Sequence, residues 1–338
     1  MIAHPPPLGV LDLSPIPSGS DGRTALTNTL DLARAAERFG YSRHWLAEHH
    51  NTPGMASSAP EIMVGQVAAA TERIRVGAGG IMLPNHSPLH VAESFRVLHA
   101  LYPGRIGRGI GRAPGTDSVT ASALRRRAAT VGAEEFPEQM YELLAYAGDG
   151  FPADHPYAGV HAEPRDVALP PIWMLASSEY GARAAAALGT GLAFARYLNP
   201  RDTAAIAREY RETFQPSPAR PEPRLILAVS VVVADSARRA DELVMSGALG
   251  LLRMRKGFPA PVPTPEEALA HEYSDWEQDQ VRRYLRAQVY GEPMVVRERL
   301  RELVAETGAD ELLVMSTIHD HAERVRSYEL LAEAWGLR

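Results

Sequence analysis

Short apolar runs alternate with amphipathic segments along almost the whole chain, and this alternation constrains the fold more than any other feature. A parallel pair of strands needs a long crossover connection, usually a helix, so the alternation is typical of a parallel sheet. Eight runs have the length and composition of buried strands. Eight strand–helix units make a (β/α)8 TIM barrel, and we predict an α/β fold of that type. The predicted strands are Leu8–Leu13, His44–Ala47, Ile74–Ile81, Ile106–Ile110, Ile172–Ala176, Leu192–Tyr197, Leu225–Val233 and Leu312–Thr317.

The main alternative is an open, doubly wound sheet, which would show the same local pattern. No GxGxxG motif follows the first predicted strand, so that alternative loses its usual support. The apolar runs LILAVSVVV and ELLVMS suit strands that are buried on both faces. The chain has 338 residues with 45% hydrophobic content, and a barrel of this size is commonly one domain. We expect a single domain over residues 1–338.

Two intervals between predicted strands are longer than the others. The stretch from Arg112 to Pro170 holds a helix-prone, arginine-rich piece and then the proline- and glycine-containing segment 151–169. The stretch from Gly247 to Arg286 holds GFPAPVPTPEE and a charged helix, which suits a lid or a packing insert. We predict insertions in the loops after strands 4 and 7.

Charge and composition exclude several classes of function. The 41 acidic and 35 basic side chains are interspersed, so no face is basic enough to bind nucleic acid. The start MIAHPPPLGV lacks the basic and apolar regions of a signal peptide, and no apolar run reaches the roughly 20 residues of a membrane span. We therefore expect a cytoplasmic protein. Without cysteine the chain has no thiolate nucleophile, so redox chemistry requires a cofactor.

Two histidines follow the second predicted strand, in AEHHN at residues 47–51. Side chains at the C-terminal ends of barrel strands face the active site, so His49 and His50 are candidate general acids or bases. The alternative is that one of them hydrogen-bonds a buried backbone carbonyl. The same placement makes Asp12 and Ser14, after the first strand, and Asn85 and His86, after the third, candidate substrate-pocket residues.

A glycine pair interrupts the third predicted strand in GAGGIMLPNHSP, residues 77–88. Glycine inside a strand is tolerated where a ligand or another backbone approaches closely, and a flat ring stacked on the strand would explain both glycines. A simple barrel bulge explains them equally well.

Two further strand ends have features of an anion site. Arg112 follows the fourth strand in RIGRGIGRAPGTD, where a guanidinium can bind a phosphate or carboxylate through two hydrogen bonds. A surface salt bridge is the alternative. The fifth strand runs into MLASSEYGA, where hydroxyls and free amides at a helix start suit a phosphate group. An ordinary N-cap by Ser177 or Ser178 is the alternative there.

A metal-dependent hydrolase is a weaker hypothesis, because the histidine spacing does not fit a barrel metal site. The first strand has no H-x-H, and an acidic ligand at a late strand end is missing unless Asp320 serves. We expect no metal. The histidines weighed are His49, His50, His86 and His90, with His319 and His321 beside Asp320.

At WLAEHH, at ASSAPEIMVGQVAAATERIRVGAGGIMLPNHSPLHVAE, at YPGRIGRGIGRAPGTD and at GADELLVMSTIHDHAERVRSYELLAE, the chain resembles the bacterial luciferase-like monooxygenase family. The resemblance runs from Leu8 nearly to Trp335. It implies the same barrel and reduced flavin mononucleotide, FMNH2, as cofactor. Gly111 occupies the place of a reactive cysteine in the luciferases, so light emission is not implied. Gly107 and Arg108 replace an acidic and an apolar residue common in relatives, which puts the packing of that strand in doubt.

The resemblance also implies roles for individual residues. His49 resembles the histidine implicated in flavin–oxygen chemistry, and Gly79 and Gly80 match a pair joined by a cis peptide bond beneath the flavin ring. The implied cofactor-binding residues are Gly79, Gly80, Ile81, Arg112, Ala176, Ser177, Ser178, Tyr180 and Gly181.

From these observations we predict a flavin-dependent monooxygenase that uses FMNH2 and O2 to oxidise a small organic substrate. An F420-dependent oxidoreductase on the same barrel, or a non-catalytic flavin-binding partner subunit, are the alternatives. The expected partners are the small-molecule substrate, O2, a separate NAD(P)H:flavin reductase and a second copy of the chain in a homodimer.

Overall fold

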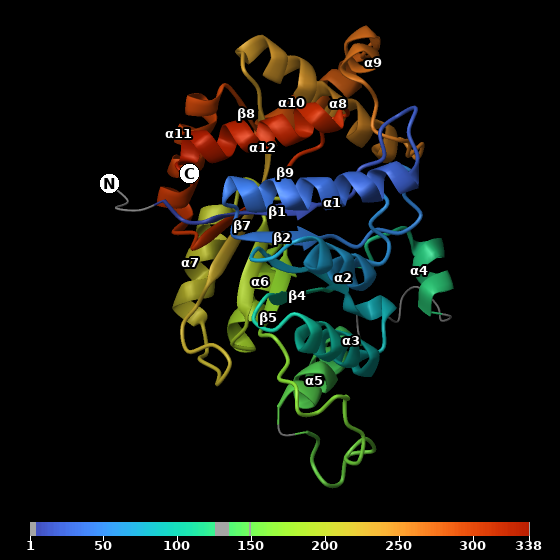
Figure 1. The fold of residues 1–338 in the computed structure, drawn as a ribbon, viewed down its shortest axis with the longest axis vertical. Coiled ribbons are helices and arrows are strands. Elements are labelled where there is room, and N and C mark those ends of the chain that lie inside the picture. Colours follow the sequence, from blue (N-terminus) through green and yellow to red (C-terminus); the bar gives the residue numbers. More distant parts are fainter. Residues whose placement is uncertain (1–4, 126–134, 149, 338) are drawn as a thin grey trace.

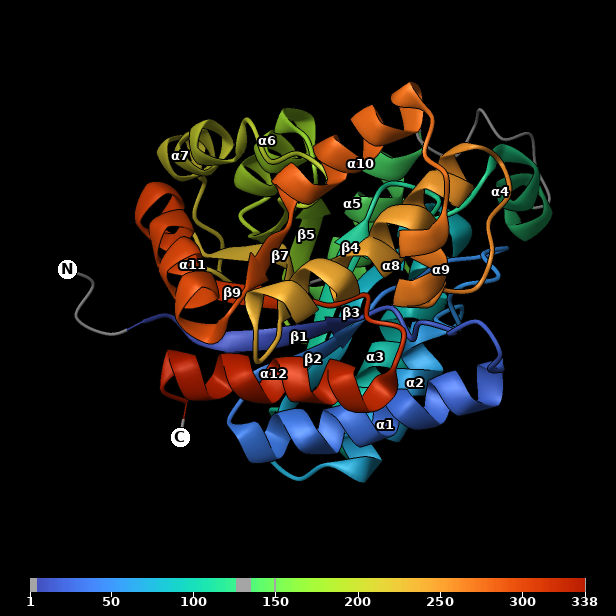
Figure 2. The ribbon, with the colours of Figure 1, turned by 90° about the horizontal axis from the view of Figure 1, so that it is seen from above.

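The strand–helix alternation of the sequence folds into a closed, parallel barrel surrounded by helices (Figures 1 and 2). The computed structural model describes residues 5–125, 135–148 and 150–337. Neighbouring barrel strands are parallel, and the ring closes through the β6–β7 and β1–β9 pairs, which confirms the predicted (β/α)8 fold. The barrel strands are β1 (Leu8–Asp12), β2 (Arg43–Leu46), β3 (Arg75–Met82), β4 (Ile106–Gly111), β5 (Ile172–Ala176), β6 (Gly191–Ala195), β7 (Leu225–Val233) and β9 (Glu311–Met315).

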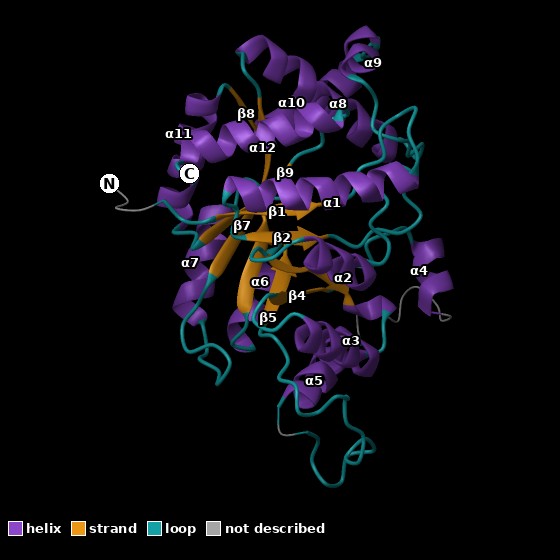
Figure 3. Cartoon of the chain, viewed as in Figure 1, coloured by secondary structure: helices purple, strands orange, loops and turns teal. Residues whose placement is uncertain are grey.

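A layer of helices covers the outside of the ring (Figure 3). Apolar side chains on alternate strand positions pack against these helices and form the larger part of the core. The covering helices are α1 (Gly22–Phe39), α2 (Pro60–Ala70), α3 (Pro88–Leu101), α6 (Glu179–Ala187), α7 (Thr203–Thr213), α8 (Ala237–Arg255), α11 (Pro293–Thr307) and α12 (His321–Trp335). Among the described residues, no helix has both the length and the apolar character that crossing a membrane requires.

The loop after β4 is the first of the two enlarged connections. It contains α4 (Ser118–Arg125), α5 (Phe136–Ala147) and a stretch at 151–169 without helix or strand. Arg96 of α3 holds this stretch, since its guanidinium donates to the carbonyls of Tyr146, Pro164 and Arg165 at 3.0–3.2 Å. Residues 126–134 and 149 of the predicted insertion, and residues 1–4 of the predicted leaderless start, lie outside the described residues.

The connection between β7 and β9 is the second enlarged connection. After α8 it forms α9 (Pro265–Ala270), α10 (Asp275–Ala287) and a three-residue strand, β8 (Val289–Gly291). The short helices begin with complete capping boxes at Thr264 and Ser274, so each has local backbone partners of its own. Strand β8 pairs with the end of β7 outside the ring and was not predicted.

Inside the barrel, the indole of Trp45 occupies the space beside β3 and β4. A Cβ atom at Gly77 would lie 2.4 Å from the Gly107 carbonyl oxygen, and one at Gly107 would lie 2.9 Å from Trp45 Nε1. Glycine at both positions therefore lets the two strands and the indole approach closely. Arg108 points the other way and is buried, with burial and Arg96 lowering its pKa to about 9. Strand β4 thus accommodates Gly107 against the Trp45 indole and Arg108 on its other face, the two residues whose packing the family resemblance put in doubt.

Candidate functional site at the C-terminal mouth of the barrel

The candidate residues follow β1, β2, β3, β4 and β5, whose carboxyl ends meet at one mouth of the barrel because the strands are parallel. The loops there also contain the two non-glycine residues of the described chain with left-handed backbone, Ser14 (φ 48°) and Asn51 (φ 51°). Backbone in this region is uncommon outside glycine and is frequent at functional sites.

The buried carboxylate of Glu48 joins the loop after β2 to the loop after β3. Its Oε1 accepts hydrogen bonds from His50 Nε2 at 2.8 Å, His86 Nε2 at 2.9 Å and Asn85 Nδ2 at 3.1 Å. Its Oε2 accepts from the backbone N–H of Met82 at 2.8 Å. The predicted residues His50, Asn85 and His86 therefore meet around a residue that sequence reasoning passed over.

The charges of this cluster support one another. Burial alone would raise the pKa of Glu48, but the hydrogen bonds from His86, His50 and Met82 hold it below its usual value. Burial alone would lower the pKa of His86, but Glu48 raises it above its usual value. The arrangement favours an ionised Glu48 beside a protonated His86.

His49 differs from its neighbour His50. No hydrogen bond joins its side chain to another described residue, and its Nδ1 is buried without a partner. Burial, together with the charge of His50, lowers its pKa, although Glu48 acts in the opposite direction. A neutral imidazole with an uncommitted nitrogen can accept or relay a proton, so the structure separates the two candidate histidines.

Asp12 and Ser14 lie in the outer layer, which differs from the pocket-lining position expected from the sequence. Both are fully buried. Asp12 Oδ1 accepts from Arg324 Nη2 at 2.5 Å and from the Ser14 N–H at 2.8 Å, and His44 Nε2 lies 3.6 Å from Oδ2. Burial raises the pKa of Asp12, but Arg324 and His44 outweigh it and keep the carboxylate ionised. The group joins β1 to α12.

The Gly79–Gly80 peptide bond is cis, as the family resemblance implied. The β3–β4 register shifts between Ala78 and Ile81, so the bulge considered as an alternative is also present. A Cβ atom at Gly80 would lie 2.6 Å from the Gly109 carbonyl oxygen, and one at Gly79 would lie 2.9 Å from Trp45 Cε3. Close packing alone therefore accounts for both glycines. Ile81 is buried on the helix side of the strand.

The two predicted anion elements come together. The Arg112 guanidinium lies over the Tyr180 ring, with its Cζ 4.3 Å from the ring centroid. Ser178 is the N-cap residue of α6, but its side chain makes no capping hydrogen bond, which leaves the amides of the first turn available. A Cβ atom at Gly181 would lie 2.7 Å from Ala176 Cβ, so glycine there brings the helix start against the end of β5.

A cavity of about 570 Å³ lies beside this helix start, between α6 and α7. Its wall includes Ser178 and Tyr180 but also the carboxylates of Glu179, Asp202 and Glu209, which repel an anion. The side of Tyr180 that faces Arg112 is therefore the better position for a phosphate.

These residues fit a phosphate-bearing cofactor. Arg112 is exposed and forms no ion pair with a carboxylate among the described residues, and the uncapped turn of α6 supplies N–H donors beside it. The interior next to them is apolar, with Leu13, Leu175 and Met315 partly buried around it. In the described ranges, no three His, Asp or Glu side chains are grouped so as to hold a metal ion.

A family model described as luciferase-like monooxygenase matches residues 7–331. A luciferase-like monooxygenase of Escherichia coli is 41% identical over 321 residues, which cover 95% of this chain and 94% of the relative. The N-acetyl-S-alkylcysteine monooxygenase of Bacillus subtilis is 33% identical over 328 residues, 97% of each chain.

Solved structures agree with this match. The crystal structure of apo-MsnO8 superposes with a TM-score of 0.87 at 36% identity, covering 99% of both chains. At 17% identity, the oxygenating constituent of 3,6-diketocamphane monooxygenase in complex with FMN has a TM-score of 0.70 and covers 97% of both chains. The coenzyme F420-dependent tetrahydromethanopterin reductase of Methanopyrus kandleri, at 18% identity and with the same coverage, has a TM-score of 0.67. These last two show a common fold.

Proposed function

Because this chain belongs to the luciferase-like monooxygenase family, we propose that it is a flavin-dependent monooxygenase that uses FMNH2 and O2 to oxidise a small organic substrate. The observation that carries the choice of cofactor is the meeting of Arg112, Tyr180 and the uncapped start of α6 at the barrel mouth. Together they offer a cation and amide donors to one phosphate group.

The bound flavin would supply the reducing electrons and the site of reaction with O2. The chain's own residues would bind, orient and protect the cofactor and the substrate. Arg112 and the first turn of α6 would hold the phosphate. His49 would accept or donate a proton, since its Nδ1 is uncommitted. Glu48 would fix the surrounding loops through His50 and His86.

The proposal includes two partners. FMNH2 would come from a separate NAD(P)H:flavin reductase. The chain would act as a homodimer.

An anaerobic titration tests the cofactor assignment. Reduced FMN should bind more tightly than oxidised FMN or F420. Arg112→Ala should weaken FMN binding about 10- to 100-fold, the equivalent of a charge-assisted hydrogen bond, and leave riboflavin, which has no phosphate, almost unaffected. Arg165→Ala removes an exposed arginine elsewhere and serves as the control.

Tighter binding of F420 would overturn the flavin assignment in favour of the deazaflavin alternative. Equal weakening of FMN and riboflavin by Arg112→Ala would remove Arg112 from the phosphate site.

A further inference from the structure

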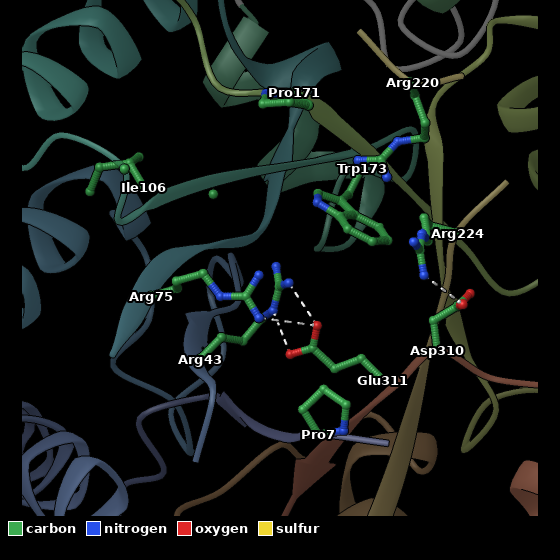
Figure 4. Close-up of a pocket in the computed structure, with 12 residues that line it drawn as sticks. Pro7, Arg43, Arg75, Ile106, Pro171, Trp173, Arg220, Arg224, Asp310 and Glu311 are labelled. Carbon is green, nitrogen blue, oxygen red and sulfur yellow. Dashed lines mark hydrogen bonds and ion pairs between the residues drawn. The ribbon is translucent and has the colours of Figure 1, made fainter. Parts of the chain in front are cut away.

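The opposite, N-terminal mouth of the barrel contains a second cavity, of about 460 Å³ (Figure 4). Its walls come from the starts of several barrel strands and from the segment before β7. The charged residues that line it are Arg43, Arg75, Arg220, Arg224, Asp310 and Glu311. Four guanidinium groups thus face two carboxylates. The volume is within the range of small-molecule sites.

Both carboxylates already have partners. Glu311 accepts hydrogen bonds from Arg43 Nε and Nη2, each at 2.7 Å, and from the Ser42 hydroxyl at 2.6 Å. Asp310 accepts from the backbone N–H of Leu225 at 2.7 Å and from Arg224 Nη1 at 3.2 Å. Dashed lines in Figure 4 mark the ion pairs. Both carboxylates therefore have hydrogen-bond donors without the two remaining arginines, Arg75 and Arg220.

Arg220 is the cation left over. Its guanidinium lies over Trp173, with Cζ 4.4 Å from the ring centroid. It forms no ion pair with a carboxylate of the described chain, and its Nε is buried without a hydrogen-bond partner. Arg75, which is exposed, donates from Nε to the Ser42 carbonyl at 3.4 Å and lies 3.6 Å from Glu311 through Nη2. Donors on both residues are therefore available to a bound group.

Stabilisation of the barrel is the competing explanation, because charged residues at the N-terminal face of a TIM barrel commonly serve it. That explanation suits the Arg43–Glu311 pair, whose side chains are 4% and 7% exposed. It does not suit an excess of two positive charges, since a partly buried cation without a counter-charge costs stability. The excess favours an anionic ligand of charge about −2.

We propose that this N-terminal mouth binds a small dianion, a phosphate monoester or a dicarboxylate, held by Arg220 and Arg75 against the Trp173 ring. Guanidinium groups recognise both classes through paired N–H···O bonds. The site is independent of the proposed cofactor site, which lies at the other end of the barrel.

Tryptophan fluorescence tests the proposal, because Trp173 lies beneath Arg220. The protein is titrated with inorganic phosphate and with succinate, against sodium chloride at equal ionic strength. We expect a saturable change with at least one dianion and none with chloride. Arg220→Gln should weaken that binding about 10- to 100-fold. Arg238→Gln, which removes an arginine that is 90% exposed on α8, should not.

Further variants separate the two ends of the barrel. Arg112→Ala should leave the saturable change intact, whereas Trp173→Phe should remove it while calorimetry still detects binding. A saturable change with phosphate but not with succinate would identify a phosphate monoester as the ligand class. A change with succinate alone would identify a dicarboxylate. No saturable change with either dianion, or equal affinity in Arg220→Gln that melts like the parent protein, overturns the proposal.

Discussion

Glu48 accepts hydrogen bonds from two loops at the C-terminal mouth, and its oxygen Oε1 alone accepts from His50, His86 and Asn85. A buried carboxylate is stable only when such donors surround it. His49 and His50 were predicted at a strand end, whereas Glu48 between Ala47 and His49 was not predicted as a site residue. Glu48 lies at the same strand end and could have been predicted in the same way. Its contacts with Asn85 and His86, which are distant in sequence, could be found only from the structure.

The Glu48–His86 pair should make stability depend on pH. The folded-state pKa of Glu48 is lowered, so its contribution is present above about 4.5 and is lost as pH falls through the lower folded value. The folded-state pKa of His86 is raised, so its contribution is present below about 6.5 and is lost as pH rises through the higher folded value. His86→Gln should therefore be most destabilising between these limits, by about 1–3 kcal/mol.

Melting temperatures from pH 3 to 9 check this expectation. The exposed His90 of α3 supplies the control, since His90→Gln should give a difference that hardly changes with pH. A His86→Gln deficit as large at pH 9 as at pH 5.5 would contradict the ion pair.

His49→Ala should lower turnover about 10²- to 10⁴-fold, the usual contribution of a general acid or base, while FMNH2 affinity and melting temperature stay close to the parent values. The reason is that the His49 side chain makes no structural hydrogen bond in the described chain. His50→Ala is the comparison, because it removes a donor from Glu48 and should lower the melting temperature by a few degrees. If His49→Ala melts early but keeps parental turnover per folded molecule, its role is structural.

At the scale of elements, β3 and β4 lie close together because glycine at Gly77 and Gly107 places no side chain between them. Gly77→Ala should destabilise the protein by about 1–3 kcal/mol, since the new Cβ would meet the Gly107 carbonyl at 2.4 Å and backbone atoms cannot move aside cheaply. Gly65→Ala on α2 is the control. Its Cβ would meet only Leu98 at 3.4 Å, and alanine should stabilise the helix by about 0.5–1 kcal/mol. Thermal unfolding of the two variants compares them, and equal melting temperatures would refute the close-packing explanation.

The strands could be predicted best where they are apolar throughout. Residues 225–233 are buried at all nine positions and were predicted to the residue. The starts of β2 and β9 were each predicted one residue too late, because Arg43 and Glu311 interrupt the apolar pattern while their backbones still pair with neighbouring strands. The third strand was predicted one residue too early, at Ile74 instead of Arg75. Strand β8 was missed because three residues give no periodic pattern.

For the whole molecule, the two mouths of one barrel differ in chemistry. The C-terminal mouth combines a buried acid–histidine cluster with the Arg112–Tyr180 contact. The N-terminal mouth gathers four arginines around Trp173. Trp45 and its apolar neighbours fill the barrel interior between the two mouths, so a ligand at one end would not touch a ligand at the other.

Strand β9 pairs with β1 on one side and β7 on the other, so the ring can close only after this last barrel strand has been synthesised. Until then the nascent chain holds an open sheet whose outer edges expose unpaired amides and carbonyls, and such edges invite pairing with other chains. Translation that stops before Glu311 would therefore yield an aggregating product rather than a smaller barrel. Closure removes these edges, because β1 and β7 both pair with β9.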